Sequence, residues 1–451
     1  MTPHQGSPTL LQQLVRRTAA PVLAPDRERA ARHLLDWAAC ALAASGLEPA
    51  RAMRATLISE DPPEHLWTMS DQTDALGAVL ADGALGSLLE MDDVHRAAVL
   101  HPGPVVIPAA LATARELGVD TASLLDGIVR GYEVVIRLGR SLGLGHYRYW
   151  HPSSTCGAFG AAMAAASIRG LDETRTTWAL ANAGTRTGGL WQMRHEPVPS
   201  KALHTALAAQ TGYLAAALAD QGFSGPVSLL EGEQGLFAAM APEADPAELI
   251  GESRHWLIHE VSFKPWPACR HAHPAMDALM AIEPRPAARD IDHIEVASYP
   301  AALDFCDCLH PTTPGQARFS IQHALASILV HGRPRIRHYE PEALDHPEVA
   351  HLRARIQLRS DEGFARRFPA HFGAAVRLRT RTGDAFEARV ADAWGDPEWP
   401  LGDHDLAAKA ADLLDYAGLE QDAAQRLIEG TLKLAAAPEQ AAIAALRKIW
   451  T

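Results

Sequence analysis

Residues 27–45 read RERAARHLLDWAACALAAS, and this stretch indicates the class of the fold. Its apolar residues recur at helical spacing, and Asp26 stands directly before it, where a helix start favours a short acidic side chain. The same pattern, rich in Ala and Leu, returns at residues 120–143, 171–183 and 201–221. The chain up to about residue 255 is therefore predicted to be all-helical.

The pattern changes after residue 255. Apolar and polar residues alternate, as in half-buried strands, at 291–298, 353–358, 374–380 and 385–390, with an apolar helix at 316–332. Helices follow from residue 403 and resemble the first part of the chain in composition. We predict a mainly α protein with a large all-helical domain and a smaller α+β lid domain. The expected boundaries are residues 1–255, completed by 400–451, for the first and 256–399 for the second.

Composition narrows the class of protein. The chain has 451 residues, of which 47% are hydrophobic and 21% charged, as in a folded globular protein with more than one core. Its formal charge of −13 argues against a general nucleic-acid binder, which needs a basic face. The charge still allows a small anionic substrate, because binding of such a molecule depends on local charge.

Cysteine usage and apolar runs indicate the compartment. The five cysteines are odd in number and scattered, which is typical of a reduced cytosolic chain. Cys306 and Cys308 have no third cysteine nearby, so an iron–sulfur cluster is not expected. The first 20 residues lack a signal-peptide pattern, and the apolar runs are shorter than the roughly 20 residues of a membrane span. We expect a cytoplasmic protein with no membrane partner.

Two motifs combine polar side chains with helix boundaries. The segment EMDDVH at 90–95, followed by HPG at 101–103, offers Asp92, Asp93 and two histidines as metal ligands, or forms a polar helix end. The two carboxylates point to different helix faces and H-E-x-x-H spacing is missing, which disfavours metal. The segment HYRYWHPSSTCG at 146–157 is either an anion site at a helix start or an ordinary helix cap.

Two further segments are basic and poor in acids. Residues 186–204 form a Gly- and Pro-containing loop that holds Arg186, Arg194, Lys201 and His204 against a single Glu. Residues 261–274 contain no acid, and they carry four basic side chains beside Trp266, namely Lys264, Arg270, His271 and His273. The alternative for the first segment is a solvated basic loop without a function. The alternative for the second is a metal site formed by its pair of histidines. Together the segments favour a small substrate with several carboxylates, which Arg binds bidentately.

At these positions the chain resembles the MmgE/PrpD family. The resemblance rests on segments that occur in the family's order: EMDDVH…HPG at 90–103, GYEVVIRLG at 131–139, HYRYWHPSSTCGAFGAA at 146–162, SKALHTALAAQTG at 200–212, GFSGPVSLLEGEQG at 222–235, FKPWPACRHAHPAMDA at 263–278 and ARFSIQHALA at 317–326. It implies a homodimer with a helical domain and an α+β lid, an active site between them, and no required metal or organic cofactor.

The resemblance also implies roles for individual residues. Lys201 and His273 are expected to be the paired acid and base, assisted by His101 and His151. The expected substrate-binding residues are Glu90, which stands where the family usually has Asp, and Asp93, Arg186, Arg194, His204, Lys264 and Arg270. The leading reaction is dehydration of a 2-hydroxy di- or tricarboxylate similar to 2-methylcitrate, by proton removal next to a carboxylate.

Several other functions stay open at this point. The same site would be an epimerase of a dicarboxylate such as iminodisuccinate if its two groups exchange protons at one carbon, or a decarboxylase of the cis-aconitate type. A rival from another class is a metal-dependent hydrolase built on Asp92, Asp93, His95 and His101. A non-catalytic homologue that only binds a carboxylate metabolite is the last alternative.

Overall fold

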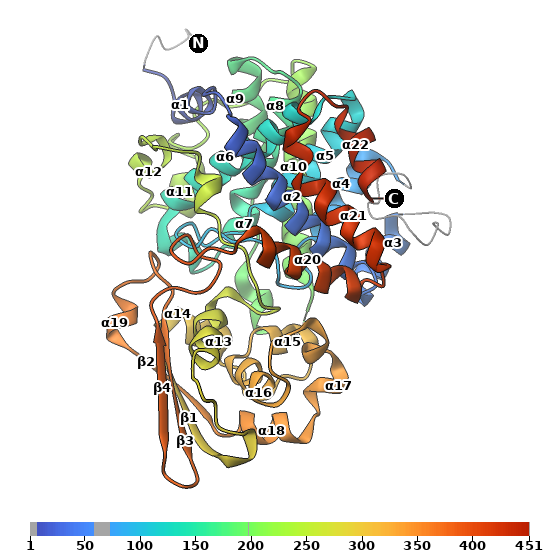
Figure 1. The fold of residues 1–451 in the computed structure, drawn as a ribbon. Helices are drawn as coiled ribbons and strands as arrows, with labels where there is room; N and C mark the ends of the chain where they lie inside the picture. Colours follow the sequence, from blue (N-terminus) through green and yellow to red (C-terminus); the bar gives the residue numbers. More distant parts are fainter. Residues whose placement is uncertain (1–6, 58–72, 197, 451) are drawn as a thin grey trace.

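A computed structural model describes residues 7–57, 73–196 and 198–450. Figure 1 shows a larger body made of helices and, beside it, a smaller body that contains the sheet. The prediction of a mainly α protein with a smaller α+β part is confirmed. None of the helices in the described ranges combines the length and the apolar character that crossing a bilayer requires.

The larger body takes its helices from both ends of the chain. They are α1 (Leu10–Arg17), α2 (Ala24–Ala44), α3 (Glu48–Leu57), α4 (Ala75–Leu85), α5 (Gly103–Leu117), α6 (Thr121–Tyr147), α7 (Pro152–Thr155), α8 (Gly157–Ile168), α9 (Glu173–Gly184), α10 (Ser200–Asp220), α11 (Leu236–Met240), α12 (Pro246–Ile250), α20 (Asp403–Tyr416), α21 (Gln421–Leu432) and α22 (Ala442–Trp450). The C-terminal helices α20 and α21 pack against α2, as Figure 1 also shows. A single apolar core, which contains Leu34 and Leu413, runs through both groups.

Local chemistry explains where these helices begin and how closely they pack. Asp120 and Asp172 each accept a hydrogen bond of 2.8 Å from a backbone N–H in the first turn of the following helix, which satisfies a donor that has no partner within the helix. Helices α6 and α8 meet at Gly131 and Gly160. A Cβ on Gly131 would lie 2.8 Å from the Gly160 carbonyl oxygen, so only glycine permits this backbone contact.

The smaller body is a four-stranded mixed sheet covered by helices. The strand order is β2-β1-β3-β4; β1 (Ile291–Ser298) pairs in parallel with β2 (Ile356–Ser360) and antiparallel with β3 (Ala374–Thr380), which forms a hairpin with β4 (Ala385–Val390). The helices are α13 (His273–Met280), α14 (Pro300–Cys306), α15 (Pro314–Arg318), α16 (Ile321–His331), α17 (Pro341–Leu344), α18 (Pro347–Arg353) and α19 (Glu362–Ala365).

Two elements of the smaller body differ from the sequence prediction. The second strand begins at Ile356 rather than at Arg353, because helix α18 continues through Arg353 and its guanidinium contacts His323 at 3.4 Å. The helix predicted over 316–332 is broken into α15 and α16. Ser320 causes the break, because its hydroxyl accepts a hydrogen bond of 2.9 Å from the His323 N–H and so starts a new helix.

Candidate active site

The loop between α4 and α5 carries most of the candidate site. Its backbone pairs with the segment of the chain that carries Lys264: Val94 N–H donates to the Ser262 carbonyl at 3.0 Å, and the Val94 carbonyl accepts a bond from Ser262 N–H at 2.8 Å. Glu90 has a φ of 55°, a left-handed conformation that costs a non-glycine residue about 1 kcal/mol. Lys264 Nζ compensates by donating to the Glu90 carbonyl oxygen at 3.1 Å.

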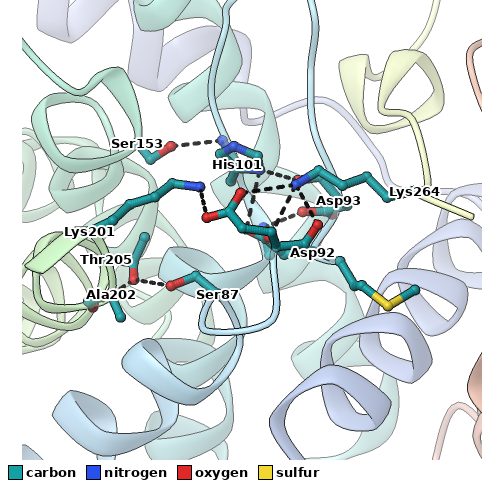
Figure 2. A network of polar contacts seen from close by, with 12 residues as sticks. Ser87, Asp92, Asp93, His101, Ser153, Lys201, Ala202, Thr205 and Lys264 are labelled. Atoms are coloured by element: carbon teal, nitrogen blue, oxygen red, sulfur yellow. Dashed lines mark hydrogen bonds and ion pairs between the residues drawn. The ribbon is translucent and has the colours of Figure 1, made fainter. Parts of the chain in front are cut away.

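Ammonium groups from outside this loop alternate in space with its carboxylates. Lys201 Nζ donates to Glu90 Oε1. Lys264 Nζ lies 3.6 Å from the other oxygen of Glu90 and 3.4 Å from Asp92 Oδ1. Figure 2 shows the two lysines reaching the loop from opposite sides. Two ammonium groups and two carboxylates therefore neutralise one another in a region where Glu90, Asp92 and Lys264 are buried.

The ion pairs keep these buried groups charged. Burial alone would raise the pKa of Glu90, but the ammonium groups of Lys201 and Lys264 outweigh it and hold this pKa below its usual value. Burial would likewise lower the pKa of Lys264, and the carboxylates of Asp92 and Glu90 instead hold it above its usual value. Lys201 differs from Lys264 because 14% of its side chain is exposed, against 0% for Lys264.

His101 is a neutral imidazole with one nitrogen to spare. Its Nδ1 lies 2.8 Å from the Asp93 carbonyl oxygen and 3.2 Å from Asp92 Oδ2, and because both are acceptors, Nδ1 carries the proton. Nε2 then presents a lone pair. Burial, followed by the charges of Lys264 and Lys201, lowers the pKa of His101 well below its usual value. A neutral imidazole whose tautomer is fixed in this way is suited to act as a general base.

The Asp93 carboxylate is hydrogen-bonded to other parts of the protein. Its Oδ1 accepts a 2.8 Å hydrogen bond from Gly103 N–H, and its Oδ2 accepts bonds of 2.7 Å from both Tyr132 OH and His33 Nδ1. Burial raises the pKa of this carboxyl to about 6. Both oxygens are thus used inside the protein, so the predicted contact of Asp93 with substrate is not supported by this geometry.

His151 and His204 form a pair next to Lys201. Their Nδ1 atoms lie 3.2 Å apart, so one of the two must carry the proton of the shared hydrogen bond. His151 packs on Trp191 with the ring centroids 4.5 Å apart, and its buried Nε2 has no hydrogen-bond partner among the described residues. Burial and then the Lys201 charge lower the pKa of both histidines. The sequence-predicted residues His101, His151, Lys201 and His204 are therefore brought together.

His273 and Arg270 have a different environment. The His273 side chain is fully buried; its Nε2 donates to the Ala268 carbonyl at 3.0 Å, and its Nδ1 receives a bond of 3.1 Å from Arg270 Nη1. Arg270 also donates to Asp396 Oδ1 at 2.5 Å and to the Trp394 carbonyl at 2.9 Å. Neither His273 nitrogen has a free lone pair or a free proton, and the Arg270 guanidinium already has a carboxylate.

The remaining predicted arginines lie in the exposed loop before α10. Arg186 is exposed, and the described residues provide no carboxylate within ion-pair distance of it. Arg194 is also exposed, and its guanidinium lies 4.6 Å from the ring centroid of Phe305, which belongs to the smaller body. Arg194 thus connects the two bodies, whereas no contact among the described residues brings Arg186 close to Lys201.

Sequence reasoning missed the positions of Tyr147 and His271. His271 Nδ1 contacts Tyr299 OH at 2.8 Å, and its Nε2 lies 3.5 Å from Tyr147 OH. Burial, followed by the charges of Lys264, Arg270 and Lys201, lowers the pKa of His271 to about 3. The only signal in the sequence was that His271 shares a basic segment with His273.

The four residues of the hydrolase alternative do not converge. Asp92 faces Lys264 and His101, Asp93 faces His33 and Tyr132, and His95 Nε2 lies 3.5 Å from Glu260. Elsewhere in the described part of the chain, one group of side chains is close enough together to bind a metal ion: His371, Asp392 and Glu398. These two carboxylates already have a cationic partner, because the Arg96 guanidinium pairs with both Asp392 and Glu398.

Comparisons with known proteins identify the family. Residues 15–249 match the family model of the MmgE/PrpD N-terminal domain, and residues 266–434 match that of the MmgE/PrpD C-terminal domain. The chain therefore belongs to the MmgE/PrpD family.

Three relatives of this chain are named as cis-aconitate decarboxylases or as decarboxylase-like. The chain is 26% identical to the cis-aconitate decarboxylase-like protein oryM of Aspergillus oryzae, over 93% of this chain and 92% of that protein. It is 26% identical to the cis-aconitate decarboxylase of Mus musculus over 74% and 70% of the two chains, and 23% identical to that of Aspergillus terreus over 83% and 81%. Decarboxylases are lyases, so the comparisons support the lyase class for this chain.

Proposed function

We propose that the protein is a lyase that acts on a small di- or tricarboxylate by acid–base catalysis with its own side chains. The observation that carries this proposal is that carboxylates of one loop hold both a neutral imidazole, His101, and an accessible ammonium group, Lys201, which reaches the loop from helix α10. Lys201 pairs with Glu90 and His101 contacts Asp92, two residues further along the chain. A base and an acid held by carboxylates of the same loop are what an elimination next to a carboxylate requires.

Dehydration is the leading reaction. In this scheme His101 Nε2 removes the proton from the carbon next to a substrate carboxylate, and the electron pair forms the new C=C bond. Lys201 gives its proton to the departing hydroxyl, which leaves as water. The carboxylate charge that grows during proton removal is stabilised by the Lys201 side of the site and by Arg194 at the junction of the two bodies.

Decarboxylation of a cis-aconitate-like substrate is the second candidate, and the activities for which the relatives are named favour it. Here the C–C bond to one carboxylate breaks, CO2 leaves, and the electron pair accepts a proton from Lys201. Epimerisation of a dicarboxylate needs the same base and acid on two faces of one carbon. The three reactions differ in product but share Lys201.

We propose a different role for one residue than the sequence predicts. The predicted partner of Lys201 was His273, whose nitrogens are both occupied by Arg270 and the Ala268 carbonyl. We therefore assign the base to His101 and a positioning role to His273. Arg270 and Lys264 likewise hold protein carboxylates in this arrangement, whereas Arg194 stays available to a substrate.

Proton NMR in D2O tests the function. Chelator-treated enzyme is mixed separately with methylcitrate, citrate, cis-aconitate and iminodisuccinate. A new alkene signal from a saturated hydroxy acid indicates dehydration, loss of a carboxylate from cis-aconitate indicates decarboxylation, and deuterium incorporation without net conversion indicates epimerisation. Activity that disappears with the chelator and returns with a metal would support the hydrolase alternative. Binding without turnover throughout the panel would support the non-catalytic homologue.

We also propose that two copies of the chain associate through helix α10. Leu203, Leu207, Leu214 and Leu218 recur at helical spacing on one face of this helix and are 38–45% exposed. A second copy offers the same apolar stripe, and a twofold axis would bury both. Light scattering is expected to give twice the chain mass for the natural protein and the single mass for Leu207→Glu/Leu214→Glu; a monomeric natural protein would refute the dimer.

A further inference from the structure

A cavity lies beside the loop between α4 and α5. It is bounded by the segment at residues 333–337 and by helix α20. It contains about 450 Å³ of empty space, including the part that is open to solvent. Met91, between Glu90 and Asp92 in sequence, and Pro265, next to Lys264, contribute to its lining. None of the side chains that we place in the reaction site lines this cavity. The cavity is therefore a separate place on the molecule.

The wall formed by residues 333–337 is unusually basic for a chain of net charge −13. Its sequence is RPRIR, and all three arginines line the cavity. Arg337 pairs with Asp415 across the cavity at 3.2 Å. Within the described part of the chain, the guanidinium groups of Arg333 and Arg335 have no carboxylate within ion-pair distance, and Arg333 lies 5.6 Å from the ring centroid of Trp266.

The opposite wall adds one further cation. Lys409 on α20 lines the cavity and is buried, with its Nζ donating to Asp36 at 2.5 Å and to the Met91 carbonyl at 2.6 Å. Asp412 and Asp415 are the acidic residues of the lining. Because Asp36 neutralises Lys409, four cations stand against three carboxylates, which leaves one positive charge in excess. Three guanidinium groups on one short segment repel one another, and a bound anion relieves that repulsion.

We propose that this cavity is a second anion-binding site, which binds a multivalent anion carrying phosphate or carboxylate groups. Arg333 and Arg335 bind it with their planar donor pairs, which match the oxygens of either group. Arg337, already paired with Asp415, forms the rim. The site is independent of the proposed reaction, because no residue of the reaction site takes part in it.

Titration calorimetry at low ionic strength tests the proposal, with tripolyphosphate and tricarballylate as the two probes. The protein is the full chain carrying Lys201→Met, so that the carboxylate probe is not drawn to the reaction site. We expect one bound probe per chain, and the tighter of the two identifies the group that the site prefers. Arg333→Gln/Arg335→Gln in the same background is expected to weaken binding at least about tenfold, because two charge-assisted contacts are lost.

A matched control distinguishes a site from general charge. Arg379 and Arg381 are exposed and lie at the β3–β4 hairpin of the same body, so Arg379→Gln/Arg381→Gln removes the same charge away from the cavity. This control is expected to bind as the parent does. Failure of the parent to bind either probe at millimolar concentration, or equal weakening by the two double substitutions, would overturn the proposal. The single substitution Arg335→Gln removes an exposed side chain and leaves the contact between Arg333 and Trp266 intact. It therefore repeats the test without disturbing that contact.

Discussion

Two clusters of charged side chains, both largely buried, each combine basic groups, carboxylates or a carboxylate, and one histidine. The first, the reaction network, consists of Lys201, Glu90, Lys264, Asp92 and His101. The second, the Asp396 cluster, consists of Asp396, Arg96, Arg270 and His273. Asp396 accepts hydrogen bonds from Arg270 at 2.5 Å and from Ser262 at 2.6 Å, and pairs with Arg96 at 3.1 Å.

The clusters differ in what remains unoccupied. In the Asp396 cluster both nitrogens of His273 and the terminal nitrogens of Arg270 have protein partners. In the reaction network His101 keeps the lone pair of Nε2, and Lys201 keeps part of its side chain in contact with solvent. The comparison teaches that residue type does not separate a reactive group from a structural one. A reactive group differs from a structural one in having a free lone pair or a free proton.

The largest expected effect comes from removing the acid of the reaction network. Lys201→Met is expected to lower kcat by about 10²–10⁴, the range of a lost general acid. The thermal midpoint should change little, because Glu90 keeps Lys264 as a partner. Steady-state kinetics on the substrate identified by NMR, together with thermal unfolding, measures both. A variant with unchanged kcat would remove Lys201 from the mechanism.

Breaking the Asp396 cluster is expected to act on stability instead. Asp396→Asn leaves Arg270 and Arg96 without their shared carboxylate in a buried place, and the loss of one partner of a buried ion pair costs about 3–5 kcal/mol. Denaturant unfolding is expected to show this loss, with the kcat of the folded fraction close to that of the natural protein. A fall in kcat comparable to that of Lys201→Met, without loss of stability, would contradict the division between the clusters.

The smallest effect concerns pH. Burial and the two lysines hold the pKa of His101 well below 6.5, so this base stays unprotonated as the pH falls from 8 to 6.5. We therefore expect kcat/KM to be flat over this range and to fall only at lower pH, as His101 takes up a proton. In the residual activity of Lys201→Met, the acid limb should move to higher pH, because one cation that lowers this pKa is gone. An acid limb centred at or above pH 6.5 in the natural protein would argue against His101 as the base.

Much of the fold could be predicted from the sequence because its signals are local. The helix starts after Asp120 and Asp172 and the alternation of residues 374–390 are properties of neighbouring residues. The errors arose where a local pattern was ambiguous. The apolar run 316–332 conceals the Ser320 cap, and the alternation from Arg353 overlaps the end of a helix.

The site could be predicted only as a set of segments. Motif order brought His101, His151, Lys201 and His204 to attention, and the structure places them together. Which histidine of the segment 261–274 is occupied depends on Arg270 and on Asp396, which lies more than a hundred residues further along the chain. No spacing rule reports such a contact. The support of Asp93 by His33 and Tyr132 is long-range in the same way.

The most direct test of the account compares two histidines. His101→Gln and His273→Gln are assayed side by side for kcat on the substrate found by NMR and for thermal unfolding. The account predicts that His101→Gln loses about 10²–10⁴ in kcat and stays folded, whereas His273→Gln unfolds at lower temperature and keeps its kcat when folded. The opposite result, with full turnover in His101→Gln and a folded but inactive His273→Gln, would contradict the central claim that the base is the histidine with the free nitrogen.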